Sequence, residues 1–352
     1  MNHHCSELPV VLLHNVDRSW SETEIAEIED LVKVMETGLK TAGHPTFTAT
    51  LDGDKLARVM RPFNPNEVIV FNWCEEIPGV SRSAGLLARQ LEDLGFTYTG
   101  ADAQALQFSY NKPAVKESLS QYNVPSPRWM IADAIKPGEW DCFPAIIKPA
   151  FEHSSIGITH EAVVHSFEEL ARQVEKVRAN YNQPVMVEDF IDGREFHVTV
   201  AGNGKLQVFP IAEMDFSAIG DDRGRLCTYD SKFDPASPDY QIIQLKLPAE
   251  LSNKEKKQLE EVAIAGYKAS DCRDYGRLDI RLRDGIFYVL DVNPNADISP
   301  DTSVTLSAEL AGYPYSQFCS LLVQLAAKRH PVFGREKAGK IRQEIPVMVP
   351  GG

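Results

Sequence analysis

Apolar and polar positions follow a helix–strand alternation in the first part of the chain. An apolar run at 9–13 predicts a buried strand, and the sequence SETE at 21–24 is typical of a helix capping box. The helix that follows carries apolar residues at intervals of three and four and is expected to end near Gly43. Further elements are predicted at 67–73 (strand), 82–94 (helix) and 96–99 (short strand). This alternation predicts a parallel sheet over roughly the first hundred residues.

The pattern changes after Gly100. A smaller unit is predicted, with strands at 128–132, 144–149 and 185–190 and a helix at 166–180. From Gly193 the predicted strands are longer and antiparallel, and they read EFHVTVAGN and KLQVFPIAE around an Asn203–Gly204 turn. Helices at 252–270 and 304–328 flank the last predicted hairpin. The fold class is therefore α/β, with α+β character in the C-terminal half, and the expected division is 1–100, 101–184, 185–330 and a tail at 331–352.

The stretch GRLDIRLRDGIFYVLDVNPN at 276–295 predicts a β-hairpin. A two-residue Asp284–Gly285 turn would place a carboxylate on the apolar face, opposite Leu278. We therefore expect a three-residue loop, Arg283 to Gly285, with Gly285 in the left-handed region. This register pairs Leu282 with Ile286, Ile280 with Tyr288, and Leu278 with Leu290.

The other face of this hairpin gathers Arg277, Asp279, Asp291 and Asn293. Two carboxylates and an amide oxygen suit a hard cation such as Mg²⁺. A magnesium ion held by few protein oxygens usually takes its other ligands from phosphates and water. The hairpin is therefore predicted to form the floor of an ATP site.

Charge and composition narrow the class of protein. The chain has 352 residues and a net charge of −14, which argues against a nucleic-acid or anionic-membrane surface. Its six cysteines are scattered without a CxxC pair, and no apolar run approaches the length of a membrane span. We therefore expect a cytoplasmic protein that neutralises any polyanionic substrate locally, with metal and a few lysines.

Three further stretches contain candidate functional residues, and each also has an interpretation without a functional role. PAIIKPAFEHSSIGI at 144–158 ends a strand in Lys148 and continues into a small loop suited to phosphate, although a surface turn would look similar. VMVEDFIDGREF at 185–196 holds Glu188 and Glu195, which are either rim carboxylates or part of a nucleotide hinge. SYNKPAVK at 109–116 places Lys112 at a helix start, where a solvated lysine is the commoner outcome.

The order and spacing of these stretches are more specific than any one of them. Lys112, IIKPAFEHSSIGI, VMVEDFIDGREF, CTYDSKF, and GRLDIRL with VLDVNPN resemble the ATP-grasp fold of the D-alanine–D-alanine ligase family over about residues 95–328. The resemblance implies an ATP-grasp fold behind an N-terminal parallel-sheet domain. It also implies an ADP-forming ligase that phosphorylates a carboxylate with ATP to an acyl phosphate and then joins it to an amine.

The resemblance also implies roles for single residues. Lys112 and Lys148 would hold the nucleotide phosphates under the 152–157 loop with Ser155, and Ser154 would assist catalysis. Glu188 and the backbone of Asp189 and Ile191 would bind adenine, and Glu195 the ribose. Lys232 would reach the γ-phosphate, and Arg277 would stabilise the oxyanion. Asp279, Asp291 and Asn293 would hold Mg²⁺, with Mn²⁺ as an alternative ion. The partners implied are a small carboxylate and a small amine, both amino-acid-like, and a homodimer is compatible with the resemblance.

The sequence departs from the family pattern at positions that bear on which substrates are accepted. The stretch LLHNVDRSWSETE lacks the glycine pair that leads to the family's ammonium-binding glutamate, for which Asp17 or Glu22 are possible substitutes. His153 and Asp297 stand where the family has glycine, Asp291 replaces a glutamate, and Thr302 replaces a serine. These changes predict that D-alanine is a poor substrate. The alternatives are a true D-alanine–D-alanine ligase, a non-catalytic ATP-binding regulator, and an ATP-grasp subunit of a carboxylase.

Overall fold

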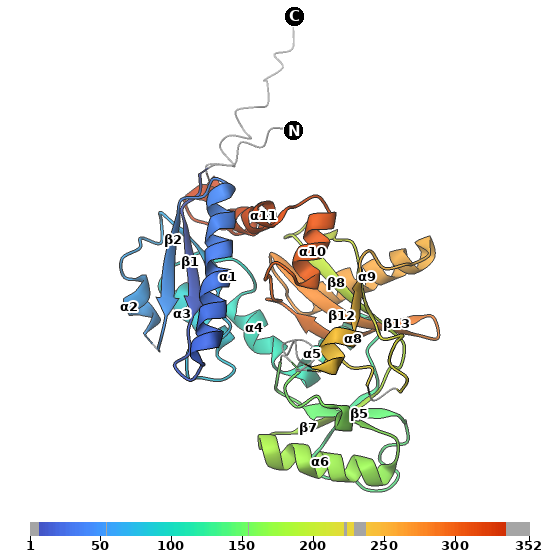
Figure 1. Cartoon of the computed structure of the whole chain (residues 1–352). Helices are drawn as coiled ribbons and strands as arrows, with labels where there is room; N and C mark the ends of the chain where they lie inside the picture. Colours follow the sequence, from blue (N-terminus) through green and yellow to red (C-terminus); the bar gives the residue numbers. More distant parts are fainter. Residues whose placement is uncertain (1–6, 54, 154, 222–223, 229–236, 336–352) are drawn as a thin grey trace, which may run out of the picture. The chain divides into compact units, whose positions relative to one another are not determined.

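The computed structural model in Figure 1 describes residues 7–53, 55–153, 155–221, 224–228 and 237–335. The chain divides into two compact units. Unit 1 comprises Met1–Ala103 together with Gly312–Gly352, and unit 2 comprises Gln104–Ala311. The first boundary lies close to Gly100, where the sequence pattern changes.

Unit 1 is built on a parallel sheet with the strand order β2-β1-β3, as the alternation of strands and helices predicts. The capping box at Ser21 and Glu24 is present at the start of α1, and it satisfies backbone groups at both positions. The elements are β1 (Val10–Asn15), α1 (Glu22–Thr41), β2 (Thr46–Leu51), α2 (Leu56–Met60), β3 (Ile69–Trp73), α3 (Ala84–Asp93) and α11 (Tyr315–Ala327). The expected strand at 96–99 is reduced to a single parallel bridge between Tyr98 and Val70.

The helix that we predicted at 304–328 is two helices, and this prediction was wrong. It divides into α10 (Ser303–Leu310) and α11, with Gly312 at φ 89° and Pro314 at the N-cap of α11. A glycine in the left-handed region ends a helix, and the residue before a proline is disfavoured in helical geometry. The break divides the chain between the units, because α10 belongs to unit 2 while α11 packs on α1 and β3 in unit 1.

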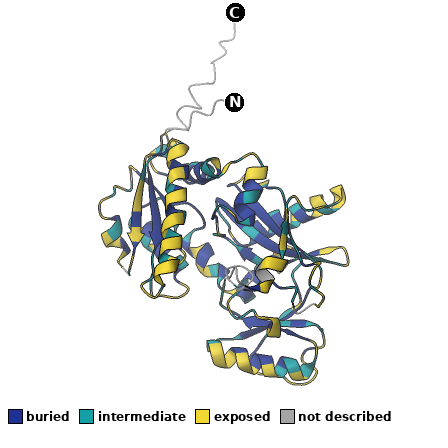
Figure 2. Cartoon of the chain, viewed as in Figure 1, coloured by how far each residue is buried: buried dark blue, intermediate teal, exposed yellow. Residues whose placement is uncertain are grey.

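The first sheet of unit 2 has the antiparallel order β4-β7-β5-β6, and α6 packs on it. Figure 2 shows the contrast between the buried strands of this sheet and the exposed outer side of α6. Helix α6 buries Leu170, Val174 and Val177 against the strands. The elements are α4 (Ala103–Ser109), α5 (Lys112–Gln121), β4 (Trp129–Ala132), β5 (Ala145–Pro149), β6 (Val163–Val164), α6 (Phe167–Tyr181) and β7 (Val185–Asp189).

The second sheet of unit 2 is antiparallel, with the order β11-β10-β8-β12-β13 and with β9 paired to β8. Helix α9 packs against β8, β12 and β13, and α5 packs on α9. The stretch KLQVFPIAE, expected as one strand, is divided around Pro210, which has no N–H to donate to a ladder. The elements are β8 (Arg194–Ala201), β9 (Gln207–Val208), β10 (Ala212–Asp215), α8 (Pro238–Ile242), β11 (Gln244–Lys246), α9 (Asn253–Ala269), β12 (Tyr275–Arg283) and β13 (Ile286–Asn293).

The register predicted for the β12–β13 hairpin was wrong near its turn. The loop has two residues, Asp284 at φ 53° and Gly285 at φ 77°, rather than three. These dihedral angles match a type I′ turn, which Asp-Gly favours. A β-bulge between Asp279 and Ile280 leaves Leu290 without a direct partner.

Because of the bulge, apolar residues pair with apolar residues at both ends of the hairpin, on the buried face of the sheet. Near the turn Leu282 lies opposite Phe287 and Ile280 opposite Val289, and beyond the bulge Leu278 lies opposite Val292. All the apolar residues of β13 that enter the core therefore differ from those predicted. Ile286 is exposed, and Tyr288 and Leu290 are only partly buried. An extra residue in one strand shifts its alternation by one, which the predicted register did not include.

The division of the chain into three domains and a tail stays a prediction. The pairing of strands and the grouping of helices can be compared with its expected boundaries. Strand β7 pairs with β4 and β5, so the boundary expected after residue 184 separates β7 from its own sheet. Helix α11, expected within 185–330, groups with unit 1.

Candidate active site

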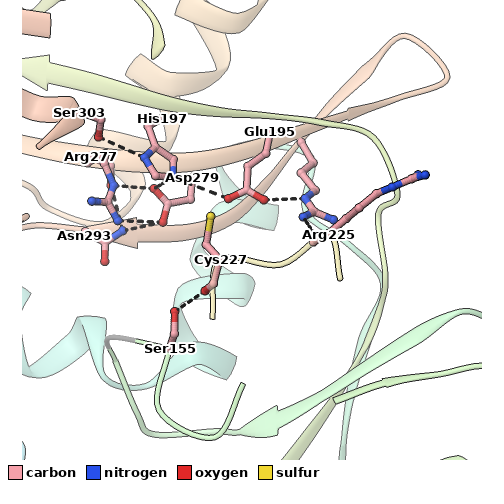
Figure 3. Close-up of polar contacts among 10 residues, drawn as sticks. Ser155, Glu195, His197, Arg225, Cys227, Arg277, Asp279, Asn293 and Ser303 are labelled. Carbon is pink, nitrogen blue, oxygen red and sulfur yellow. Dashed lines mark hydrogen bonds and ion pairs between the residues drawn. The ribbon is translucent and has the colours of Figure 1, made fainter. Parts of the chain in front are cut away.

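The polar face of the β12–β13 hairpin brings four predicted residues together, and Figure 3 shows three of them, Arg277, Asp279 and Asn293. Arg277 lies opposite Asn293, and Asp279 lies opposite Asp291. The Arg277 guanidinium donates to both Asp279 oxygens, at 2.7 and 3.0 Å, and Asn293 Nδ2 donates to Asp279 Oδ2 at 3.3 Å. Burial opposes the charge of Arg277, but the Asp279 carboxylate outweighs it and raises the pKa of the guanidinium.

The donor set on this face fits a magnesium ion. Asp279, Asp291 and Asn293 offer carboxylate and amide oxygens, which are the ligands that Mg²⁺ prefers. Both Asp279 oxygens accept from Arg277, yet each carboxylate oxygen has a second lone pair. The face can therefore hold a hard cation beside an arginine.

A buried cluster of one carboxylate and two ammonium groups lies between β5, β7 and α5. Glu188 pairs with Lys116 Nζ at 2.6 Å through one oxygen and with Lys148 Nζ through the other. The three side chains are only 2%, 2% and 7% exposed for Glu188, Lys116 and Lys148. Burial alone would raise the pKa of Glu188, but the two ammonium groups outweigh it and the pKa is lowered. The cluster therefore carries a net positive charge.

Lys116 also joins the hairpin to this cluster. Its ammonium donates to the carbonyl oxygens of Val289 and Leu290, at 3.1 and 3.0 Å. Leu290 is the extra residue of the β-bulge, so Lys116 satisfies backbone acceptors where the ladder is interrupted. Burial lowers the pKa of Lys116 and Glu188 acts against this shift. The lysine therefore links the cluster around Glu188 to the strand that carries Asp291.

Lys112 lies at the first position of α5, as predicted, and it faces the loop after β5. Its ammonium donates to the Glu152 carbonyl, and its backbone N–H donates to the Ala150 carbonyl at 3.2 Å. Burial lowers the pKa of Lys112 to about 8, partly offset by the charge of Asp291. The lysine is thus positioned between the proposed phosphate loop and the proposed metal face.

The loop after β5 has the backbone of a tight turn. Ser155 has φ 59°, and its hydroxyl donates to the Cys227 carbonyl at 2.8 Å. Gly157 has φ 79°, and a Cβ there would lie 2.8 Å from the Pro149 ring. A side chain at this position would force the loop away from the strand, so glycine is required.

His153, which replaces a family glycine, turns towards the junction of α4 and α5. Its Nε2 lies 3.1 Å from Ser109 Oγ, and its ring packs edge-on to Tyr110 with centroids 4.4 Å apart. Burial lowers the pKa of His153 to about 4, so the ring is neutral at pH 7. His153 therefore adds volume beside Lys112 but no charge.

Residues 189–191, the proposed nucleotide hinge at the end of β7, already make several hydrogen bonds within the protein. The Asp189 N–H donates to the Arg128 carbonyl at 2.8 Å, and the Ile191 carbonyl accepts from Arg281 at 2.9 Å. The Asp189 carboxylate pairs with Arg283, which donates at 3.0 Å to Oδ1. The assignment of adenine to this hinge stays a prediction.

Glu195 lies on β8 and is held by an arginine that we did not predict at the site. Arg281 Nε donates to Glu195 Oε2 at 2.7 Å, and the guanidinium also donates to the Arg225 carbonyl. Burial acts against ionisation, but the Arg281 charge outweighs it and holds the pKa of Glu195 far below its usual range. Glu195 is therefore an ionised carboxylate with one oxygen fixed.

Two further sequence-predicted residues, Ser154 and Lys232, lie outside the described residues. The exposed Asp297 accepts from the Ser299 N–H and hydroxyl through Oδ1, and Thr302 Oγ1 donates to the Asp297 carbonyl at 3.1 Å. Asp297 thus stabilises the turn in which it lies.

Asp17 and Glu22, the two candidates for holding a substrate ammonium, both lie in unit 1. Asp17 accepts from Ser19 and, at 2.6 Å, from the Gly79 N–H. Glu22 is exposed in the first turn of α1. Neither contact pattern reveals a substrate role.

Lys116, Arg281 and His197 belong to this site and were missed by sequence reasoning. Lys116 follows Lys112 by four residues on one helix, so it lies on the same face. Arg281 continues the alternation of Arg277 and Asp279 along β12, and His197 follows Glu195 with the same two-residue spacing on β8. These spacings were the available signals.

Comparisons with known proteins identify the family that the chain resembles. Residues 129–324 match a family model described as the D-ala D-ala ligase C-terminus. The uncharacterized protein y4sG of Sinorhizobium fredii is 30% identical over 83% of this chain and 86% of its own length. The D-alanine–D-alanine ligase of Desulforamulus reducens is 28% identical over 70% of this chain and 78% of its own. A crystal structure of the Bacillus anthracis D-alanine–D-alanine ligase complexed with ATP matches the fold at a TM-score of 0.70 and 19% identity, over 94% of this chain and 99% of that one.

The fold and the matches define a protein of the ATP-grasp class. More particularly, the chain belongs to the D-alanine–D-alanine ligase family. Members of this family are ATP-dependent, ADP-forming ligases that form C–N bonds and use Mg²⁺ with ATP. The prediction of an ATP- and Mg²⁺-dependent carboxylate–amine ligase is thereby confirmed at the level of the family.

Among the described residues, no helix combines the length and the apolar character that crossing a membrane requires.

Proposed function

We propose that this chain joins the carboxylate of one small, amino-acid-like molecule to the amine of another, with ATP as the source of energy. The polar face of the β12–β13 hairpin is the observation that carries the proposal. It combines an arginine with two carboxylates and an amide, and Lys112, whose pKa responds to the charge of Asp291, lies near it. Phosphoryl transfer depends mainly on positioning and charge neutralisation, and these residues supply both.

The reaction proceeds in two steps. The γ-phosphoryl group of ATP passes to a carboxylate oxygen of the first substrate, which breaks the bond to the ADP oxygen and forms an acyl phosphate. The amine then attacks the acyl carbon, forms the C–N bond, loses a proton and expels inorganic phosphate. Arg277 stabilises the negative oxygen of that addition, and Lys112 and Lys148 hold the phosphates.

The remaining assignments follow the same proposal. Asp279, Asp291 and Asn293 would hold Mg²⁺ or Mn²⁺, and a bound ion would neutralise phosphate charge. Ser155 and its loop would cover the phosphates, Glu195 would accept from the ribose, and Glu188 with the hinge at Asp189 and Ile191 would bind adenine. Ser154 and Lys232 keep their proposed catalytic roles.

Truncation of Lys148 to alanine is expected to weaken ADP binding roughly tenfold or more. The loss of one charge-assisted phosphate contact costs about 1.5–3 kcal/mol. Isothermal titration calorimetry measures the affinity, and Lys176→Ala is the matched control because the Lys176–Glu161 pair is exposed and contributes little. Unchanged ADP affinity in the Lys148 variant would count against the phosphate role.

The substrate is proposed to differ from D-alanine. His153 adds a neutral ring beside Lys112, and Asp297 adds an exposed carboxylate near the end of the hairpin. A carboxylate in place of a glycine favours a substrate with an additional cationic or hydrogen-donating group. Relatives such as the D-alanine–D-alanine ligase of Desulforamulus reducens favour the alternative, a true D-alanine–D-alanine ligase.

A panel of D- and L-amino acids, presented singly and in pairs, separates these two proposals. We expect ADP release to be slow with D-alanine and faster with an amino acid that carries an extra donor group. The measurement is a coupled ADP assay, with hydroxylamine in place of the amine to trap the acyl phosphate as a hydroxamate. Efficient D-alanyl-D-alanine synthesis at submillimolar D-alanine would establish the alternative instead.

A non-catalytic ATP-binding regulator is disfavoured by the same residues. A protein that only bound nucleotide would not need Arg277 beside the carboxylates of the metal face. The cytoplasmic location and the homodimer are part of the proposal too. Cysteines without a CxxC pair support the first, and sedimentation velocity would decide the second.

A further inference from the structure

Three potential metal ligands of different chemistry meet beside the proposed nucleotide site. Glu195 and His197 are separated by one residue on β8, so their side chains point to the same face of the sheet. Cys227 comes from the segment that follows Arg225, and its sulfur lies near both (Figure 3). One ligand atom from each of the three residues lies within 4.8 Å of the other two.

His197 provides the observation that points to a ligand. Its side chain is 6% exposed, and its Nε2 makes no hydrogen bond to any residue that the structure describes. Glu195 Oε1 lies 3.7 Å and Asp279 Oδ1 3.8 Å from this nitrogen, and both are too distant for hydrogen bonds. A buried polar atom without a partner is costly, and its position facing two carboxylates suits an ion between them.

The surrounding contacts orient these side chains. His197 Nδ1 lies 3.1 Å from Ser303 Oγ, an arrangement that leaves Nε2 available as a ligand when Nδ1 carries the proton. Arg281 fixes Glu195 through Oε2, so Oε1 faces the histidine. Ser155 holds the Cys227 carbonyl at 2.8 Å. Outer contacts of this kind are typical of metal ligands.

We propose that Glu195, His197 and Cys227 bind a thiophilic divalent cation of the zinc class. A thiolate and an imidazole are poor ligands for Mg²⁺ but are the common ligands of Zn²⁺. Ligand nitrogen and oxygen atoms around a tetrahedral zinc ion lie roughly 3.3 Å apart, as Zn–ligand bonds of about 2.0 Å require. The Glu195–His197 separation of 3.7 Å exceeds this by a few tenths of an ångström.

Three protein ligands leave a fourth position open to water or a substrate group. The site differs in chemistry from the proposed Mg²⁺ face, although Asp279 borders both, and it shares Glu195 with the proposed ribose contact. The inference goes beyond the proposed ligase function and does not depend on it.

Cobalt(II) titration of the metal-free chain, without nucleotide or amino acids, tests this site. Cobalt(II) replaces zinc and gives a thiolate charge-transfer band in the near ultraviolet when cysteine sulfur is bound. The sequence also contains His3, His4 and Cys5, so the titration uses a chain in which these three are alanine. Competition with zinc then gives the zinc affinity.

We expect one equivalent of cobalt to develop the band and zinc to abolish it. The band should disappear in Cys227→Ser and remain in Cys142→Ser, a matched control because Cys142 is also partly buried. His197→Gln should weaken cobalt binding at least tenfold while circular dichroism stays unchanged. Absence of the band in the parent chain, or its persistence in Cys227→Ser, would overturn the proposal. The ligase proposal is tested separately, because turnover with Mg²⁺ and ATP is not measured here.

Discussion

Replacing Asp291 with alanine is expected to reduce turnover roughly a thousandfold while leaving the fold intact. The variant removes one of two carboxylates from the proposed Mg²⁺ face, and losing one preorganised electrostatic contact to a transition state costs about 3–4 kcal/mol. Asp291 is only partly buried, and its Oδ1 accepts from the adjacent Val292 N–H at 3.0 Å. The stability cost should therefore be about 1 kcal/mol, as for one hydrogen bond. Steady-state ADP release and thermal unfolding measure the two effects.

Two further variants make this result specific. Asp291→Glu restores the carboxylate that the family pattern usually has, so it should retain activity within roughly tenfold of the parent. Asp141→Ala removes an exposed aspartate that pairs with Arg128 and should change neither turnover nor stability. Wild-type turnover in Asp291→Ala, or unfolding together with loss of activity, would show that Asp291 is not a metal ligand.

Glu188→Gln is expected to destabilise unit 2 by about 3–5 kcal/mol, because it leaves two buried ammonium groups without a counter-charge. The side chains of Lys116 and Lys148 are only 2% and 7% exposed in the nucleotide-free chain, so little water is available to replace the carboxylate. Urea unfolding followed by fluorescence measures the loss. Lys116→Met added to Glu188→Gln should cost less than the sum of the two single changes, since it removes one of the uncompensated charges.

The pH dependence of this difference gives an independent test. The pKa of Glu188 is lowered in the folded chain from its ordinary 4.5, so its contribution to stability is present above about pH 4.5 and is lost as pH falls through the folded value. The gap in unfolding free energy between the parent and Glu188→Gln should therefore narrow as the pH is lowered below 4.5. A gap that is constant with pH, or an additive double variant, would mean that the cluster contributes no charge pairing.

The sequence was sufficient to predict the polar face of the hairpin because alternation along two strands places Arg277 with Asp279 and Asp291 with Asn293. It was insufficient for the register, because the bulge at Leu290 depends on contacts far along the chain. Lys116, on helix α5, stabilises that bulge by donating to the carbonyls of Val289 and Leu290. A rule based on neighbouring residues contains no such information.

The sequence pattern also gave no indication that two charged side chains of the site are buried. Lys116 and Arg281 read as exposed residues of a helix and a strand, yet each is 2% exposed. Their burial follows from the carboxylates that pair with them, Glu188 and Glu195, which lie 72 and 86 positions away.

Strand β2 was not predicted from the sequence. Its alternating pattern is short, and its exposed positions give no strong apolar signal.

Oxygen transfer from the carboxylate substrate tests the central claim most directly. The best amino acid from the panel is labelled with ¹⁸O in its carboxylate and incubated with ATP, Mg²⁺ and the amine. If the carboxylate is phosphorylated and the amine then displaces phosphate, one ¹⁸O atom must appear in the inorganic phosphate, with ADP as the other product. Release of AMP and pyrophosphate, with ¹⁸O in the AMP, would contradict the acyl-phosphate account, because the carboxylate would then have been adenylated.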